Sequence, residues 1–151
     1  MVSGKRKIVL ASGNFDLLHL GHVKYLEEAK RAGGENAKLI VIVARDSTVK
    51  KRKGKKPVMS AGQRRSLVEA LKVVDKAILG YEELDINKVL EKIRPDIIAV
   101  GHDQDEMERA VEKAIAEKGL NVQIVKIGKF GKERLNSSSK IKKKVVELFK
   151  R

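Results

Sequence analysis

The hydrophobic residues of the chain fall into short, fully apolar runs that alternate with longer stretches of helical periodicity. The apolar runs predict buried strands over residues 7–13, 39–44, 76–79, 96–101 and 122–127. The periodic stretches predict helices over residues 21–33, 60–73, 86–93, 106–118 and 137–149. Apolar strands separated by helices indicate a parallel sheet that is covered on both faces. We therefore predict an α/β fold, with one domain over residues 1–151 and a doubly wound, mostly parallel five-stranded sheet between two layers of helices.

One segment interrupts this alternation. Residues 45–57 are polar and basic and contain Gly54, so we predict a loop. Within it, six of the seven residues 50–56 are Lys or Arg. Such a run is by default a solvated, mobile stretch, but it can also bring cations onto phosphate groups.

The composition narrows the function classes. The chain lacks Cys, which excludes disulfides, thiolate metal sites and cysteine catalysis. No apolar run approaches the roughly 20 residues of a membrane span, so we expect no membrane partner and a cytoplasmic location. The net charge of +14 indicates anionic partners. Five aromatic residues are few for base stacking, so phosphorylated small molecules are favoured over nucleic acid.

The candidate chemistry lies where the first predicted strand meets the first predicted helix. His19 and His22 flank Gly21 there. A helix N-terminus presents free N–H groups and the positive end of its dipole, and glycine allows close approach, so this turn suits a phosphate group. Two alternatives are an ordinary polar surface turn and a metal site that uses His102 as a third imidazole.

The context of the two histidines is more specific. Gly13-Asn14-Phe15-Asp16 followed by His19-Leu20-Gly21-His22 resembles the G-T-F-D and H-x-G-H signature of the cytidylyltransferase-like branch of the HxGH nucleotidyltransferases, with Asn14 in place of Thr. The basic run stands where that family has a Lys-rich loop, and residues 136–141 resemble its Ser/Thr-rich turn before the last helix. The resemblance spans essentially the whole chain and implies a Rossmann-like fold.

The resemblance also implies a reaction and the residues that carry it. In this family a phosphate monoester attacks the α-phosphate of a nucleoside triphosphate directly, and pyrophosphate leaves. The implied catalytic residues are His19, His22, Lys53 and Lys50, with Lys53 the first choice from the basic run. The implied nucleotide-binding residues are Gly13, Asn14, Phe15, His19, Leu20, Gly21, His22, Asp103, Ser137, Ser138 and Ser139.

Two of these assignments have simpler alternatives. Asp103 ends a predicted strand and should face the site, but it could equally lie in a solvated turn. The serines 137–139 could bind phosphate or serve only as a helix cap. Relatives have an Arg at the position of Lys132, and Arg134 is a candidate to replace it.

The expected acceptor contacts are Asp16, Arg64 and Phe130. A divalent cation, Mg²⁺ by expectation, would bridge the phosphates; no firm protein ligand is predicted, and Asp16 is a candidate for an indirect one.

A second resemblance narrows the choice of substrates. Gly101-His102-Asp103-Gln104 is similar to the Gly-x-Asp-Gln of the archaeal FAD synthases, whereas glycerol-phosphate enzymes usually carry a nearby Trp that this chain lacks. This implies transfer of AMP from ATP to FMN, giving FAD and pyrophosphate, and a homodimer as in many relatives. The alternative is CTP-dependent transfer to glycerol 3-phosphate or a similar small monoester. A basic nucleic-acid-binding module is a distant third.

Overall fold

The computed structural model describes residues 5–81, 85–130 and 137–150. In this part of the chain, five strands form one sheet: β1 (Ile8–Gly13), β2 (Lys38–Val43), β3 (Lys76–Leu79), β4 (Ile97–Gly101) and β5 (Gln123–Ile127). Every pairing is parallel and the spatial order is β3-β2-β1-β4-β5. The predicted fold class is therefore confirmed. The strand order reverses between β1 and β4, and in such sheets ligands bind beyond the carboxyl ends of the strands at this reversal.

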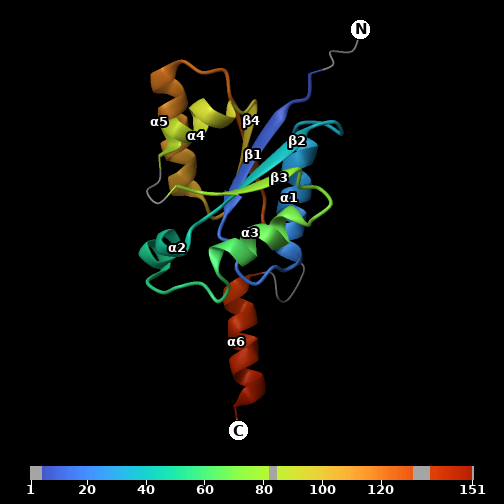
Figure 1. Ribbon diagram of the computed structural model, residues 1–151, viewed down its shortest axis with the longest axis vertical. Helices are drawn as coiled ribbons and strands as arrows, with labels where there is room; N and C mark the ends of the chain where they lie inside the picture. Colours follow the sequence, from blue (N-terminus) through green and yellow to red (C-terminus); the bar gives the residue numbers. More distant parts are fainter. Residues whose placement is uncertain (1–4, 82–84, 131–136, 151) are drawn as a thin grey trace.

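Helices cover both faces of the sheet (Figure 1). On one face lie α1 (Leu20–Ala32) and α3 (Ala61–Glu69), and on the other lie α4 (Ile86–Ile93) and α5 (Asp105–Lys118). Alternate residues of β1 belong to two separate apolar clusters, Val9 to the first and Leu10 to the second. This is why the strands are apolar throughout rather than alternating.

The prediction of a loop over residues 45–57 is wrong for residues 46–53, which form helix α2 (Asp46–Lys53). Lys and Arg are good helix formers, and four cations in the last turn interact favourably with the helix dipole. Gly54 ends the helix in the left-handed conformation, with φ of 79°, and donates its N–H to Lys50 O at 2.8 Å. Val49 is the buried apolar residue that anchors α2 to the body.

The third helix begins as predicted but ends earlier. Ser60 caps α3 by accepting the N–H of Gln63 at 3.3 Å. The helix stops at Glu69 rather than at residue 73, and tight turns follow, in which Leu71 N donates to Val68 O and Val74 N to Leu71 O. The chain must reverse here to enter β3. Asp75 holds that entry, because its carboxylate accepts the N–H of Leu39 at 2.8 Å.

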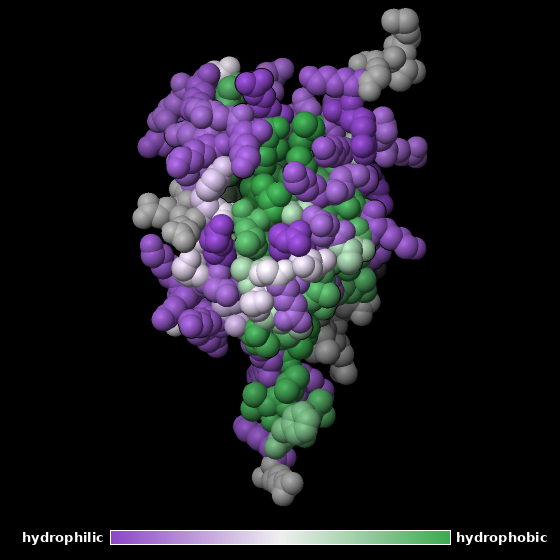
Figure 2. All heavy atoms as spheres, viewed as in Figure 1, coloured by the Kyte–Doolittle hydropathy of each residue, from purple (hydrophilic) through white to green (hydrophobic). Residues whose placement is uncertain are grey.

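The last helix, α6 (Ser138–Phe149), projects away from the sheet and its covering helices (Figure 1). Its apolar side chains are visible along its outer half in Figure 2. No helix in the described part of the chain is long and apolar enough to cross a membrane.

Candidate active site

His19 and His22 cap the helix that they begin. The Nδ1 atom of His19 accepts the N–H of Gly21 at 3.0 Å, and the Nδ1 atom of His22 accepts the N–H of His19 at 3.2 Å. The two contacts form a reciprocal capping box, in which imidazoles replace the usual hydroxyl and carboxylate. The rings stack with their centroids 3.8 Å apart.

This geometry determines the protonation state of both rings. A backbone N–H can only donate, so each Nδ1 carries a lone pair and each neutral ring carries its proton on Nε2. Burial lowers the pKa of His19. Burial, the neighbouring His19 and the charge of Lys53 lower the pKa of His22 to about 3, with Asp16 acting in the opposite sense. Both histidines are therefore neutral hydrogen-bond donors near pH 7.

The loop between β1 and α1 is strained and tightly packed. Phe15 and Leu17 have φ values of 54° and 53°, which L-residues rarely adopt. Phe15 is buried, and the centroid of its ring lies 5.4 Å from that of His22, so it packs beside the histidine. A Cβ on Gly13 would come within 3.0 Å of the Phe15 ring. Asn14 Oδ1 is buried without a partner among the described residues, which leaves it for a ligand.

Asp16 ties this loop to two distant segments. Its carboxylate accepts the N–H groups of Val58 at 2.8 Å and Met59 at 3.0 Å and pairs with Lys142 of α6 at 3.5 Å. Burial alone would raise the pKa of Asp16, but the two N–H groups and Lys142 outweigh it, so its pKa lies below the ordinary value. These contacts give the Asp16 carboxylate a structural role in the loop, and its predicted contact with an acceptor stays a prediction.

Arg64 holds the β1–α1 loop in place from the protein interior. Its side chain is fully buried, and it donates to Met59 O at 2.9 Å, Asn14 O at 2.6 Å and Ala44 O at 2.8 Å, and pairs with Asp46 at 2.7 Å. This burial argues against the predicted contact between Arg64 and an acceptor. Arg64 is instead a positioning residue that joins the ends of β1 and β2 to α2 and α3.

The two lysines predicted to act on phosphate lie on α2 rather than on a loop. Lys53 is exposed in the last turn, and its charge contributes to the low pKa of His22, so it lies within electrostatic range of that histidine. Lys50 is also exposed, three residues back on the same helix. Of the two, the structure relates only Lys53 to His22.

The serine turn reaches the same loop from the other end of the chain. Ser137 caps α6 by accepting the N–H of Lys140, and Ser138 Oγ donates to Asp16 O. Ser139 is exposed in the first turn of α6. The serines therefore lie beside the β1–α1 loop, and the cap accounts for Ser137. Lys132 and Arg134 lie outside the described residues.

The remaining predicted residues lie around these elements. Leu20 and Gly21 form the exposed and half-buried start of α1. Asp103 is exposed in the turn after β4. Phe130 follows β5 and lies 5.9 Å from the Nζ atom of Lys24, which places it on the α1 side of the sheet.

Two side chains that were not among the predicted site residues, Gln104 and Tyr25, join β1 and β4 at the reversal. Gln104 donates to Ser12 O at 3.1 Å and accepts the N–H of Gly101 at 2.8 Å. Tyr25 lies across the same strands, with its hydroxyl 3.2 Å from Ala99 O and 3.4 Å from Ser12 O. Burial raises the pKa of Tyr25, so its hydroxyl stays protonated. The Gly-x-Asp-Gln motif was a signal for Gln104, whereas Tyr25 resembled an ordinary core residue.

The described residues do not form a dedicated metal cage. They include no group of three or more His, Cys, Asp or Glu side chains that could hold a metal ion. His19 and His22 also use their Nδ1 atoms within the helix cap, which argues against the zinc alternative. A divalent cation here would have to take most of its ligands from phosphate and water oxygens, as Mg²⁺ commonly does.

Comparison with known proteins gives a consistent result. The cytidylyltransferase-like family model matches residues 10–144. An FAD synthase of Methanothermus fervidus is 48% identical over 92% of this chain and 94% of its own length. An FAD synthase of Methanopyrus kandleri is 45% identical over 98% and 96%.

Two solved structures share the fold. A Thermoplasma volcanium protein described as a lipopolysaccharide core biosynthesis protein is 44% identical, covers 83% of this chain and 99% of its own, and has a TM-score of 0.75. A pantoate-beta-alanine ligase of Francisella tularensis, at 15% identity over 84% of this chain and 60% of its own, has a TM-score of 0.59 and shows the fold alone. With the family model matching nearly the whole chain and relatives approaching half identity, this chain belongs to the cytidylyltransferase-like family of nucleotidyltransferases, alongside the archaeal FAD synthases.

Proposed function

We propose that this chain transfers the AMP moiety of ATP to FMN and so makes FAD. An oxygen of the FMN phosphate attacks the α-phosphorus of ATP, the bond from that phosphorus to the bridging oxygen breaks, and pyrophosphate leaves. The FAD synthases that it resembles at 45–48% identity over nearly their full length support this choice of substrates.

The observation that carries the proposal is the pair of neutral imidazoles at the start of α1. Their Nδ1 atoms are held by backbone N–H groups, so the Nε2–H groups of His19 and His22 are oriented as fixed donors. Donors that are positioned before the reaction stabilise charge that builds up on phosphoryl oxygens. Because the rings are neutral, they can donate their Nε2–H groups to phosphate without first taking up a proton.

Cations and the helix ends complete the triphosphate site. Lys53 of α2, within electrostatic range of His22, neutralises charge at the transferring phosphate, and Lys50 on the same helix is the second candidate. The start of α6, with Ser138 and Ser139 in its first turn, receives the β- and γ-phosphates through its backbone N–H groups, and Asn14 is assigned to the nucleotide as well. Asp103 is assigned to the nucleoside, from the turn after β4. A divalent cation, Mg²⁺ in this proposal, would be held mostly by phosphate and water oxygens and would neutralise the triphosphate, which would make pyrophosphate a better leaving group.

The test supplies purified protein with Mg²⁺, FMN and either ATP or CTP, and separates the products by chromatography. We expect FAD and pyrophosphate in equal amounts from ATP and much less product from CTP. A parallel reaction offers CTP with glycerol 3-phosphate. CDP-glycerol there, together with no FAD from ATP, would replace this proposal with the cytidylyltransferase alternative.

We also propose that the chain is a single domain and that two copies associate into a homodimer. The support is the exposed apolar surface of α6, which includes Val145, Val146, Leu148 and Phe149. These side chains lie on the helix that projects from the body (Figures 1 and 2).

A further inference from the structure

Strands β1 and β4 separate before they end. Their pairing stops at Leu10 with Ile98, although β1 continues to Gly13 and β4 continues to Gly101. On their other sides, both strands stay paired to their last residues, β1 with β2 and β4 with β5. The separation therefore lies at the reversal of the strand order, where the backbone groups that face it need partners other than a strand.

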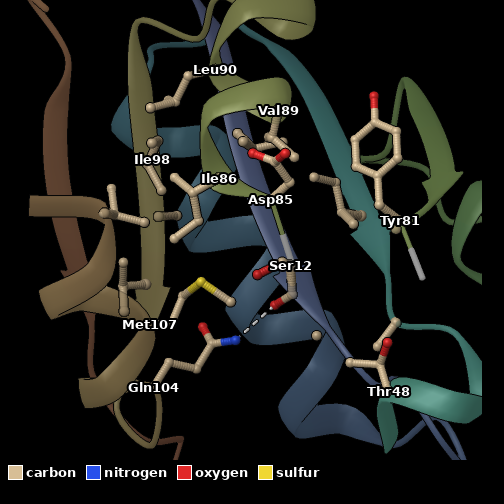
Figure 3. Close-up of a pocket in the computed structure, with 18 of the residues that line it drawn as sticks. Ser12, Thr48, Tyr81, Asp85, Ile86, Val89, Leu90, Ile98, Gln104 and Met107 are labelled. Atoms are coloured by element: carbon tan, nitrogen blue, oxygen red, sulfur yellow. Dashed lines mark hydrogen bonds between the residues drawn. The ribbon is translucent and has the colours of Figure 1, made fainter. Parts of the chain in front are cut away.

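Two side chains, Gln104 and Tyr25, supply these partners from opposite faces of the sheet, and we call the pair the strand bridge. The Gln104 amide donates to Ser12 O at 3.1 Å (Figure 3) and accepts the N–H of Gly101 at 2.8 Å. The Tyr25 hydroxyl reaches the same Ser12 O at 3.4 Å and Ala99 O at 3.2 Å. Tyr25 packs in the apolar cluster on the α1 side, whereas Gln104 lines an apolar pocket between β1, β4, α4 and α5.

Gln104 contacts the strand ends instead of capping the helix that it precedes. It is the N-cap residue of α5, yet it forms no side-chain hydrogen bond to that helix. A Ser, Asp or Asn cap would typically stabilise such a helix by about 1 kcal/mol. Gly101 leaves room for the amide, since a Cβ there would lie 3.3 Å from Gln104 Oε1 and 3.2 Å from Asp103 Oδ1. The bridge therefore lies directly beside the Asp103 side chain.

The strand bridge connects the two halves of the proposed site. One half is the turn after β4, where Asp103 is assigned to the nucleoside. The other half is the start of α1, and Tyr25 lies on that helix one turn after His22. Ser12, which both bridge residues contact, directly precedes Gly13 and the β1–α1 loop. A change at the bridge would therefore shift the two halves relative to each other.

We infer that Gln104 and Tyr25 are positioning residues for the transfer reaction. By fixing the separation of β1 and β4, they align the histidines at the start of α1 with the turn that carries Asp103. This inference rests on the proposed function and assigns neither side chain a contact with a substrate. Misplacing reacting groups by roughly 1 Å can lower a rate about a hundredfold. Loss of the bridge should therefore lower kcat and leave KM nearly unchanged.

Gln104→Glu isolates the hydrogen bond to Ser12. The introduced carboxylate can still accept the N–H of Gly101 but cannot donate to Ser12 O, whereas the protonated acid can do both. At pH 8 we expect kcat to be lower than in the parent by about tenfold or more, with KM for ATP and FMN within about twofold. The ratio of the two kcat values should rise several-fold as the pH falls to 5.5.

The ionisable neighbours of this position come from four elements. Asp103 lies in the same turn, Tyr25 comes from α1, and Arg52 of α2 and Asp85 before α4 line the same pocket. Burial and the two carboxylates would raise the pKa of the introduced acid, with Arg52 acting in the opposite sense. Burial also raises the pKa of Tyr25, so its hydroxyl stays protonated. The parent has the same neighbours, so measuring its pH profile in parallel removes their titration from the ratio.

Two further variants complete the test. Gln123→Glu makes the same change at an exposed position of β5 and should keep the kcat of the parent at each pH. Tyr25→Phe removes only the hydroxyl that contacts Ser12 O and Ala99 O, and it should lower kcat severalfold at unchanged KM. If circular dichroism shows that Gln104→Glu is unfolded, Tyr25→Phe decides the inference.

Three results would overturn the inference. The first is a parental kcat in folded Gln104→Glu and Tyr25→Phe, which would leave the bridge a merely structural role. The second is a kcat ratio for Gln104→Glu that stays constant with pH. The third is a raised KM for FMN or ATP at unchanged kcat, which would make Gln104 a substrate contact. In all three the parent protein still makes FAD, whereas a parent that makes none rejects the proposed function itself.

Discussion

Single atoms explain why imidazole is used at the start of α1. Each of His19 and His22 uses Nδ1 to cap the helix, and the same contact directs Nε2–H outward. A Ser or Asp cap would satisfy the backbone equally well but would leave no oriented donor for a ligand. The two side chains therefore combine a structural role with a binding role, and the fold protects their neutral form.

The neutral form can be observed by NMR titration of the ring nitrogens. We expect His22 to be the Nε2–H tautomer with a pKa of about 3, and His19 to titrate below the ordinary value of 6.5. His22 thus contributes stability that is fully present above about pH 6.5 and is lost as the pH falls toward 3, because the unfolded chain binds the proton more readily. The matched variant is His22→Asn. Its free energy of unfolding should fall less between pH 7.5 and pH 5 than that of the parent protein. Titration of His22 near 6.5 would contradict the assignment.

The turnover rate tests the role of His22 in a second way. His22→Ala should lose at least about a hundredfold in kcat, since removal of one preorganised donor commonly costs that much. Circular dichroism should show that the variant is folded. Unchanged kinetics would remove His22 from the site.

At the scale of elements, one buried cation holds several of them together. Arg64 leaves α3 and reaches the ends of β1 and β2 and the first residue of α2. These are the segments that carry the site. The strained β1–α1 loop keeps its shape because this network and the Asp16 contacts hold it from both sides.

Replacing Arg64 should therefore be costly. Arg64→Met leaves three backbone carbonyls and Asp46 without their donor, and we expect about 3–5 kcal/mol less stability in urea unfolding. Its neighbour Arg65 is half-buried and pairs with Glu69, so Arg65→Met should cost about 1 kcal/mol or less. Equal effects of the two substitutions would show that the buried network does not stabilise the fold.

At the scale of the whole molecule, α6 stands apart. Its N-terminal part contacts Asp16 of the β1–α1 loop through Ser138 and Lys142, whereas Leu148 is 66% and Phe149 is 82% exposed. Exposed apolar side chains that cluster on one helix, as Val145, Val146, Leu148 and Phe149 do, are typical of an interaction surface. A second copy of the chain is the cover that we propose.

Light scattering after size-exclusion chromatography tests this pairing. We expect about twice the 16.8 kDa of one chain, and half of that value after Leu148→Glu with Phe149→Glu. Leu120→Glu, at a 38% exposed position elsewhere, should leave the dimer intact. A parent protein that is monomeric at tens of micromolar would exclude the dimer.

The sequence by itself determined what depends on neighbours along the chain. Apolar runs predicted the five strands, and the histidine and serine motifs marked two helix starts, because periodicity and capping act over a few residues. Helix α2 was not predicted, because its N-cap Arg45 forms no side-chain cap and the basic run favoured a loop.

Only the tertiary structure decided which distant residues meet. The sequence offered Asp16 and Arg64 as ligand contacts, yet packing buries both and pairs them with groups from distant segments, such as Val58 with Asp16 and Asn14 with Arg64. The tertiary structure also brings Arg52 to the apolar pocket between β1, β4, α4 and α5, whereas the next residue, Lys53, lies within electrostatic range of His22. The helix residues that line this pocket follow ordinary core periodicity, so the sequence did not indicate it. Long-range packing sets burial, and burial sets whether a charged side chain meets a ligand or holds the fold.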